Sequence, residues 1–386
     1  RARAPQAAAA QAGSPGCRAV RVARLAADTA EFWLPQTATV GELKRALCDS
    51  LGLPLEEQRL VQDTQVLGDA QSLAECRSDI GSPISLTVVR VHRLQVLSGG
   101  EEMSLRLWDF ERGALVRELA GHTGNVACMA VDWALQRALS GGTDGTLRLW
   151  DLVQGTALRE LSSHRTTVWC MAVDWEARRA LCGGTAGTLR LWDLESCALV
   201  QEWRGHAAMV WCVRADWASQ RALSGGEDKV IRVWDLEQHA SVRELHGHAG
   251  NVTCVAVDWA SGRALSGGND EVLRLWDLDR GTTLGELRGH RATVSCIAAD
   301  WASQRALSGG YDGTLCLWDL EARALLWGLQ GHGAAMWCVA ADWAAQRALS
   351  GGGDGALRLW DLQGRTATRE LVSRAAVRCL AVRWPA

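Results

Sequence analysis

The sequence predicts a mostly β protein in which a small α+β domain precedes an array of repeated four-stranded antiparallel sheets. The dipeptide Trp-Asp recurs every 42 residues, and short β-prone runs alternate with turn residues inside each unit. Before the repeats, one amphipathic helix lies between strand-like runs. We expect a disordered low-complexity N-terminus (1–16), a small domain (17–91) and the repeat array (92–386).

The composition is that of a globular protein and argues against several function classes. Hydrophobic residues make up 48% and charged residues 22% of the 386-residue chain, which excludes disorder throughout. The chain has 41 basic and 44 acidic residues, so no basic surplus favours a nucleic-acid partner. No run of about 18 apolar residues occurs, and we expect neither a membrane span nor a membrane partner.

The 13 cysteines do not have the spacing of a metal site. No Cys-x-x-Cys pair or clustered Cys/His pattern is present, so we expect no metal and no cofactor. Six cysteines recur at the repeat interval, which is typical of a small buried apolar residue in a strand. Thiols in this number favour a reducing compartment, and we expect the cytoplasm or the nucleus. The six are Cys128, Cys170, Cys212, Cys254, Cys296 and Cys338.

Each 42-residue unit contains four strand-like runs separated by turn signals. In residues 122–161, a histidine precedes the runs VACMAVDW, RALSGG, TLRLWDL and ALREL. This pattern predicts a four-stranded antiparallel sheet. One such sheet cannot bury both faces alone, so neighbouring sheets must pack together. The Trp-Asp pairs are Trp108-Asp109, Trp150-Asp151, Trp192-Asp193, Trp234-Asp235, Trp276-Asp277, Trp318-Asp319 and Trp360-Asp361.

These units, with their Gly-His and Trp-Asp signatures, resemble the WD-repeat family of β-propellers over residues 92–386. The resemblance implies a seven-bladed β-propeller whose four-stranded sheets surround a channel. The first sheet has runs for three strands near residues 95–120 but none for its innermost strand. The final run, VRCLAVRW at 377–384, is expected to pair with residues 95–100 and close the ring.

The WD-repeat family carries a structural network of His, Ser or Thr, Asp and Trp in each blade. The carboxylate holds the imidazole, the imidazole bonds the hydroxyl, and the hydroxyl bonds the indole N–H, so each buried polar group has a partner. Five units match the full set. They are His122, Ser140, Asp144, Trp150; His206, Ser224, Asp228, Trp234; His248, Ser266, Asp270, Trp276; His290, Ser308, Asp312, Trp318; and His332, Ser350, Asp354, Trp360.

Ser, His and Asp are also the residue types of a hydrolase. We interpret them as structural because an enzyme needs one exposed, activated nucleophile, whereas this set recurs five times. We therefore expect no catalytic residues and no enzyme activity. Two units depart from the set, one with His164, Cys182 and Ala186 and the first with Arg374, Ser98 and Glu102.

Residues 17–91 lack the 42-residue period. Thr39 and Glu42 have the spacing of a capping box and precede apolar residues at helical intervals, which predicts one helix. The expected order β-β-α-β-β and the run EQRL at 57–60 resemble the ubiquitin (β-grasp) fold. The simpler alternative is an unrelated α+β domain that serves as a spacer or docking unit.

The resemblance to ubiquitin also implies a recognition patch. The hydrophobic patch of ubiquitin would here include Val61 and Thr87. Threonine in place of an aliphatic residue reduces the apolar area of such a patch. Proteins that recognise ubiquitin through this patch would then bind this domain less tightly.

Binding residues are expected where the repeats differ from one another. Trp169, Trp211 and Trp337 precede the periodic cysteine in three units, at the start of the innermost strand. WD-repeat proteins commonly bind partners on that face, and Trp, Tyr and Met are typical of interaction hot spots. The alternative is that these tryptophans pack between blades. The other candidates near the channel mouth are Met209, Met336, Tyr311, Glu227 and Asn269.

The sequence thus favours a non-catalytic scaffold or adaptor whose propeller face binds a protein or peptide. The alternative is a substrate receptor or shuttle in the ubiquitin–proteasome pathway that acts through the ubiquitin-like domain. In that case its partners would be ubiquitin-pathway proteins.

Overall fold

The computed structural model describes residues 17–24, 29–35, 37–51, 58–62, 65–76, 84–90, 93–161 and 166–385. Among them, the residues up to Arg93 belong to one compact unit, and Leu94–Arg383 form a second unit, here called the repeat domain. The segment 1–16, expected to be disordered, lies outside the described residues.

The N-terminal unit is a five-stranded mixed sheet with one α-helix. The sheet order is β2-β1-β5-β3-β4, in which β1 and β5 are parallel and the other neighbours antiparallel. The sequence had predicted all of these strands except the two-residue β4. The elements are β1 (Cys17–Arg24), β2 (Thr29–Pro35), α1 (Val40–Leu51), β3 (Gln58–Gln62), β4 (Gln65–Val66), the short 3-10 helix η2 (Leu73–Glu75) and β5 (Ile84–Arg90).

Helix α1 begins at the predicted capping box. The backbone N–H of Glu42 donates to Thr39 Oγ1 at 3.3 Å, and the backbone N–H of Thr39 donates to Glu42 Oε2 at 2.8 Å. Val40, Leu43 and Leu47 form its fully buried face and pack into the core of the sheet. Within the described parts of the chain, no helix has the length and apolar character needed to cross a membrane.

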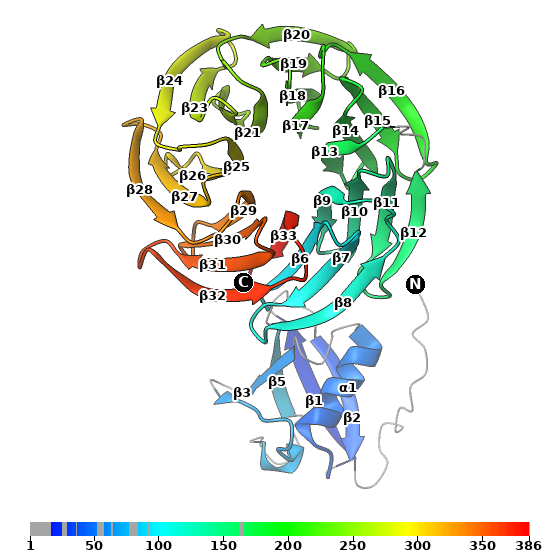
Figure 1. Ribbon diagram of the computed structural model, residues 1–386. Coiled ribbons are helices and arrows are strands. Elements are labelled where there is room, and N and C mark those ends of the chain that lie inside the picture. Colours follow the sequence, from blue (N-terminus) through cyan, green and yellow to red (C-terminus); the bar gives the residue numbers. More distant parts are fainter. Residues whose placement is uncertain are drawn as a thin grey trace. The chain divides into compact units, whose positions relative to one another are not determined.

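The described part of the repeat domain contains seven four-stranded antiparallel sheets, consistent with a β-propeller. Figure 1 shows them arranged around a central opening, with one strand of each sheet beside the opening and one at the outer edge. The innermost strands are β9 (Val126–Asp132), β13 (Val168–Asp174), β17 (Val210–Asp216), β21 (Val252–Asp258), β25 (Val294–Asp300), β29 (Met336–Asp342) and β33 (Val377–Arg383).

The other three strands of each sheet follow outward in chain order. The second strands are β6 (Gln95–Gly100), β10 (Arg137–Gly142), β14 (Arg179–Gly184), β18 (Arg221–Gly226), β22 (Arg263–Gly268), β26 (Arg305–Gly310) and β30 (Arg347–Gly352). The third are β7 (Ser104–Asp109), β11 (Leu147–Asp151), β15 (Thr188–Asp193), β19 (Ile231–Asp235), β23 (Val272–Asp277), β27 (Thr314–Asp319) and β31 (Ala356–Asp361). The outermost are β8 (Ala114–Ala120), β12 (Thr156–Leu161), β16 (Ala198–Arg204), β20 (Ala240–Leu245), β24 (Thr282–Arg288), β28 (Ala324–Gln330) and β32 (Thr366–Val372).

One sheet combines strands from the two ends of the repeat domain. Its order is β33-β6-β7-β8, and β33 pairs antiparallel with β6 so that Leu380 lies opposite Ser98. This is the pairing that the sequence predicted for 377–384 with 95–100. On its other sides β33 contacts the innermost strands β29 and β9 of the two neighbouring sheets.

Neighbouring sheets pack through a contact that requires glycine. A Cβ atom added to Gly225 of β18 would lie 2.5 Å from Cγ1 of Val252, the first residue of the next innermost strand. The absence of a side chain at Gly225 therefore makes room for this buried valine. The thiol of Cys212 spans the same junction, because it lies 3.7 Å from the carbonyl oxygen of Gly225 and 3.9 Å from that of Val252.

The periodic cysteines occupy this junction throughout the repeat domain. Cys128, Cys170, Cys212, Cys254 and Cys296 are buried, as expected, and Cys338 is half-buried. Burial raises the pKa of Cys212 and of Cys296 to about 12, so both thiols stay protonated at neutral pH. These cysteines act as small packing residues at the junctions between sheets.

We expect Gly225→Ala to lower the free energy of unfolding by about 1–3 kcal/mol, because the added methyl group meets Val252 in a packed interface. Gly333→Ala is the matched control, since nothing lies within 4 Å of a Cβ atom at Gly333. Its free energy of unfolding should change by less than about 0.5 kcal/mol. Urea unfolding of the two variants measures both effects, and equal midpoints would show that the junction tolerates a side chain.

Candidate functional site

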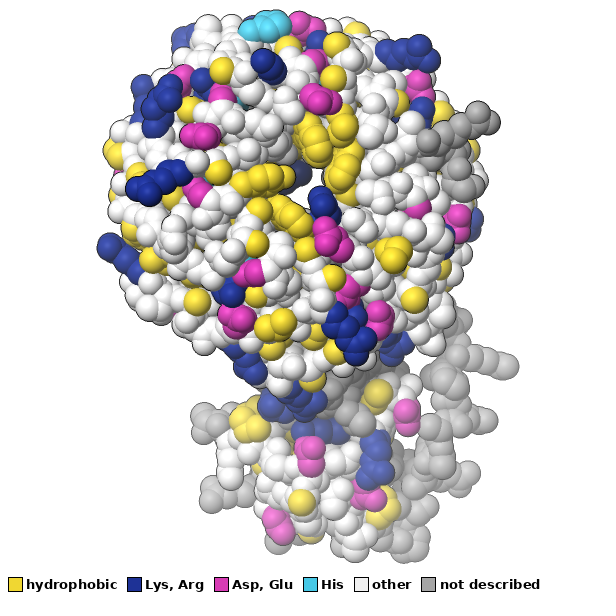
Figure 2. Space-filling model, in the orientation of Figure 1, with side chains coloured by type: hydrophobic (Ala, Val, Ile, Leu, Met, Phe, Trp, Pro, Cys, Tyr) yellow, Lys and Arg dark blue, Asp and Glu magenta, His cyan; other side chains and the backbone are white. Residues whose placement is uncertain are grey.

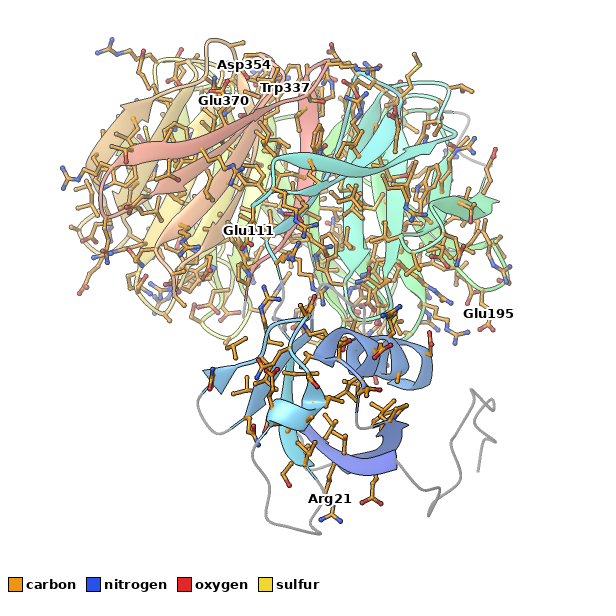
Figure 3. The ribbon with its side chains drawn as sticks, turned by 90° about the horizontal axis from the view of Figure 1, so that it is seen from below. Arg21, Glu111, Glu195, Trp337, Asp354 and Glu370 are labelled. Atoms are coloured by element: carbon orange, nitrogen blue, oxygen red, sulfur yellow. The ribbon has the colours of Figure 1, made fainter. Side chains whose placement is uncertain are left out.

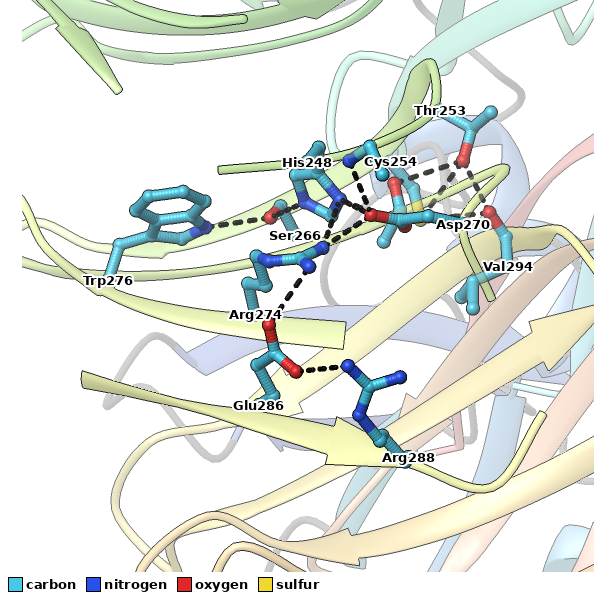
Figure 4. A network of polar contacts seen from close by, with 12 residues as sticks. His248, Thr253, Cys254, Ser266, Asp270, Arg274, Trp276, Glu286, Arg288 and Val294 are labelled. Carbon is cyan, nitrogen blue, oxygen red and sulfur yellow. Dashed lines mark hydrogen bonds and ion pairs between the residues drawn. The ribbon is translucent and has the colours of Figure 1, made fainter. Parts of the chain in front are cut away.

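The polar network of His, Ser, Asp and Trp is formed in five sheets. Around His248, the indole N–H of Trp276 donates to Ser266 Oγ at 2.7 Å, and Ser266 Oγ lies 2.6 Å from His248 Nε2 (Figure 4). Because an indole N–H can only donate, the serine hydroxyl hydrogen is left for Nε2, and Nδ1–H faces Asp270 at 3.0 Å. Every polar group of the network is thereby paired.

The other four networks repeat these contacts with distances of 2.6–3.1 Å. The five serines are fully buried. Because a nucleophile must be reached by its substrate, these hydroxyl groups stabilise the fold and do not face a ligand. The members of these four networks are His122, Ser140, Asp144 and Trp150; His206, Ser224, Asp228 and Trp234; His290, Ser308, Asp312 and Trp318; and His332, Ser350, Asp354 and Trp360.

An arginine extends several of these networks, and the sequence analysis had missed it. Arg232 donates to Asp228 Oδ2 at 2.6 Å and to Glu244 Oε1 at 2.9 Å. The corresponding Arg274 reaches Glu286 at 2.9 Å (Figure 4). The sequence does indicate this arginine, because Arg recurs two residues before the Trp of the Trp-Asp motif. These ion pairs link the third and outermost strands of one sheet.

Two units lack the full set of His, Ser, Asp and Trp, and their contacts differ from those of the five networks. In the sheet closed by β33, the indole N–H of Trp108 still donates to Ser98 Oγ at 2.8 Å. Glu102 forms an ion pair with Arg106 and accepts a hydrogen bond from the Ser373 hydroxyl at 3.1 Å, and Arg374 is exposed. This unit lacks the network histidine, as the sequence predicted, and the residue that contacts Glu102 is Ser373 rather than the neighbouring Arg374. In the other unit Cys182 is fully buried, and His164 lies outside the described residues.

Each innermost strand has a β-bulge at its start. Val168 pairs with Gly184 and Cys170 pairs with Gly183, so the intervening Trp169 has no partner in the ladder. Such a bulge turns its extra residue out of the regular alternation of side chains. The bulge residues, here called the channel mouth, are Ala127, Trp169, Trp211, Thr253, Ser295, Trp337 and Arg378.

The repeat pattern predicted the three tryptophans of the channel mouth but not Arg378. Arg378 precedes Cys379 as Trp337 precedes Cys338. The interval from Trp337 to Arg378, however, is 41 residues instead of the usual 42. The residue before the cysteine in the final run, 377–384, is Arg378, and comparing that position across the units would have identified it. Trp337 lies on the same face of the repeat domain as Asp354, and Glu111 and Glu195 lie on the opposite face (Figure 3).

The channel mouth has an aromatic half and a small polar half. The ring centroids of Trp169 and Trp211 are 5.0 Å apart, and the Arg378 guanidinium lies 4.4 Å from the Trp337 centroid. On the other side, the hydroxyl of Ser295 donates to the carbonyl oxygen of Gly309 at 3.0 Å. Figure 2 shows hydrophobic side chains gathered around the opening, with basic and acidic side chains beside them.

A cavity of about 240 Å³ lies between these two halves, and its lining includes all three tryptophans. Tyr311 and Asn269, both exposed, line it as well. Met209 is half-buried and Glu227 is exposed, and the backbone N–H of Glu227 donates to the carbonyl oxygen of Met209 at 2.8 Å. Neither of these two lines the cavity.

The prediction that Met336 is a binding residue is wrong. Its side chain is fully buried, in the position that valine occupies in the other innermost strands. A Cβ atom added to Gly309 would lie 2.5 Å from Met336 Sδ. Met336 therefore packs in the junction between two sheets. Proximity in sequence to Trp337 was misleading, because neighbouring side chains of a strand point in different directions.

In the N-terminal unit, Val61 and Thr87 are cross-strand partners on β3 and β5, and both are half-buried. Val61 also pairs with Val66 of β4, whose side chain is 57% exposed. The three residues form one row across adjacent strands. Val66 belongs to the same surface but was missed, because β4 is too short to be recognised from its sequence pattern.

Metal ligation was not expected, and across the described ranges no group of three or more His, Cys, Asp and Glu side chains could hold a metal ion. Asp354, on the same face as Trp337, instead belongs to one of the networks. Burial by itself raises the pKa of Asp354, but hydrogen bonds from His332 and Arg358 outweigh it and lower the pKa to about 2. Asp354 is therefore ionised at neutral pH and holds its histidine.

We expect the stability of the repeat domain to fall as the pH drops from 7.5 to about 5. Burial lowers the pKa of His122, His206, His290 and His332 below the usual value. The unfolded chain therefore binds protons below ~6.5 while these folded histidines remain neutral. The stabilisation is fully present above that pH and is lost as the pH falls toward the folded pKa values. Calorimetry measures this as a lower Tm and proton uptake on unfolding, whereas a constant Tm would contradict it.

A family model of the WD domain, G-beta repeat, matches six segments of the chain. The segments are 113–151, 155–193, 197–235, 239–277, 281–319 and 323–361. Each contains the outermost strand of one sheet and the first three strands of the next, so every repeat links two neighbouring sheets. No curated protein was found to match the chain. WD40 repeats generally mediate protein–protein interactions, and WD40 propellers are typically non-enzymatic. Because the matched segments cover more than half of the 386 residues, the protein belongs to the WD40 family.

Proposed function

We propose that this protein is a non-catalytic scaffold that binds a protein or peptide at the channel mouth. In this proposal the repeat domain is a seven-bladed propeller closed by β33, which serves as a rigid frame. The observation that carries the proposal is the aromatic half of the channel mouth. Trp169, Trp211 and Trp337 occupy bulges in which other sheets have Ala127, Thr253 or Ser295.

Burial separates these tryptophans from those of the Trp-Asp motif. The tryptophans of the Trp-Asp motif are buried, as illustrated by Trp150 and Trp318 at 0% exposure. Trp169, Trp211 and Trp337 are only half-buried and line the cavity. Trp175, Trp217 and Trp301 are half-buried as well, but they pack against the apolar clusters between sheets and do not line this cavity. Trp is enriched in interaction hot spots, and covering a large apolar side chain contributes about 1.5–3 kcal/mol to binding.

A second candidate places the protein in the ubiquitin–proteasome pathway. It is favoured by the N-terminal unit, in which β1 and β5 are parallel central strands and one helix packs on the sheet. The row of Thr87, Val61 and Val66 supplies a partly apolar surface for a ubiquitin receptor. We propose that this unit, over 17–91, is a ubiquitin-like domain, and its role in binding is independent of the channel mouth.

Affinity capture with the full chain separates the two candidates. The first test variant combines Trp169→Ala, Trp211→Ala and Trp337→Ala. Its matched control combines Leu115→Ala, Leu199→Ala and Leu325→Ala, which removes three exposed side chains from outermost strands. The second test variant is Val61→Arg. Captured partners are then titrated against each variant by calorimetry.

We expect the tryptophan variant to lose its partner by at least about tenfold in affinity, because hot-spot truncations cost 2 kcal/mol or more. The leucine control and Val61→Arg should bind that partner normally. Loss of ubiquitin-pathway proteins with Val61→Arg alone would favour the second candidate. A partner list and affinities unchanged by the tryptophan substitutions, at an unchanged Tm, would contradict the first.

A further inference from the structure

We propose that the channel mouth binds a carboxylate group of its partner through Arg378, with the aromatic half packing against an adjoining apolar residue. The carboxylate is either an acidic side chain or the C-terminal group of a peptide. This inference rests on the proposed binding role of the channel mouth and specifies the chemistry that it recognises.

The first argument is the charge of the residues that line the opening. The cavity at the mouth is lined by Arg378, and a second cavity of about 220 Å³ along the innermost strands is lined by both Arg378 and Arg214. Among the described residues that line the two cavities there is no Asp or Glu. Arg214 also departs from the repeat, because the other innermost strands have alanine at its position. The lining is therefore suited to an anion.

The second argument is the set of polar atoms left without partners. Within the described chain, the buried Nε1 atoms of Trp169 and Trp211 and the buried Nε of Arg378 make no hydrogen bond. All three are donors, whereas the hydroxyl groups of Thr253 and Ser295 already donate to backbone carbonyl oxygens. An ionised carboxylate offers only acceptors, so it complements this surplus of donors. The indole N–H groups are shielded, and the rings must turn when such a ligand binds.

The third argument is how Arg378 is held. Its guanidinium lies over Trp337 and within 5.9 Å of the Trp169 centroid, which orients the planar group across the opening. Its one charged partner in the described chain is Glu101, at 3.4 Å and with a side chain 42% exposed. An exposed ion pair of this kind is weak. A ligand carboxylate that bonds the guanidinium through two oxygens can displace Glu101.

The fourth argument is the shape of the cavity. About 240 Å³ is enough for one side chain of a peptide but not for a folded domain. The small side chains of Thr253 and Ser295 leave space opposite the tryptophan wall, and Asn251 and Asn269 add amide donors to the lining. The fitting ligand is therefore an extended peptide segment in which a carboxylate lies next to an apolar residue.

Three fluorescent octapeptide libraries test this inference with the full chain. The first has glutamate fixed at its centre, and the second has glutamine there. Both are amidated at the C-terminus and exclude Asp and Glu at the other positions. The third keeps the central glutamine and has a free C-terminal carboxylate. Affinities are measured by fluorescence anisotropy for the wild type and for Arg378→Gln, Arg378→Lys, Glu101→Gln and Arg374→Gln.

We expect the wild type to prefer the glutamate or the free-carboxylate library at least about tenfold over the glutamine library, as for hydrogen bonds to charged groups. The preferred library identifies the source of the carboxylate. Arg378→Gln should abolish the preference, and Arg378→Lys should keep part of it. Glu101→Gln should strengthen binding several-fold because it removes the competing carboxylate. Arg374→Gln replaces an exposed arginine between β32 and β33 that does not line the cavity, and it should change nothing.

Equal binding of all three libraries by the wild type would overturn the inference. If that binding is lost in the tryptophan variant, the proposed peptide-binding function still stands. Absence of binding to every library would overturn both. If Arg378→Gln fails to fold, Glu101→Gln still tests the inference. An unchanged affinity of Glu101→Gln for the carboxylate libraries would also contradict it.

Discussion

Each sheet of the repeat domain has two apolar faces, and neither can be covered by the sheet itself. The faces are buried only by neighbouring sheets, through junctions in which a glycine such as Gly225 admits the valine of the next innermost strand. The buried thiol of Cys212 contacts the backbone on both sides of that junction. The pairing of β33 with β6 supplies the innermost strand of the sheet that also contains β7 and β8.

The same constraint explains where a binding surface can arise. Junction glycines, buried valines and network serines are committed to packing, so substitutions there cost stability. The bulge residue of each innermost strand is outside the ladder and can vary without disturbing the sheets. That freedom accounts for the contrast between Trp169, which lines the opening, and the small Ser295 in the corresponding position. In our account a rigid ring of sheets holds these variable side chains at fixed separations.

The sequence predicted the elements whose signals are periodic or local. The Trp-Asp interval led to the four-stranded sheets, and the Thr39–Glu42 spacing located the start of α1. Features that depend on side-chain direction were missed. Adjacent residues of a strand point in different directions, so Met336 is buried beside the half-exposed Trp337. The repeat is one residue shorter before the final strand, which concealed Arg378 and also the contact of Ser373 with Glu102. Such details follow from packing in three dimensions, which a repeat interval does not encode.

We expect the sheet built from both ends of the repeat domain to be as firmly integrated as the other sheets. Hydrogen–deuterium exchange of the full chain tests this most directly, because amide protection reports the free energy of local opening. The account predicts that the amides of Val377–Arg383 are protected to the same degree as those of Val252–Asp258, and that both segments open in one cooperative step. Exchange of Val377–Arg383 within seconds, while Val252–Asp258 remains protected, would contradict it.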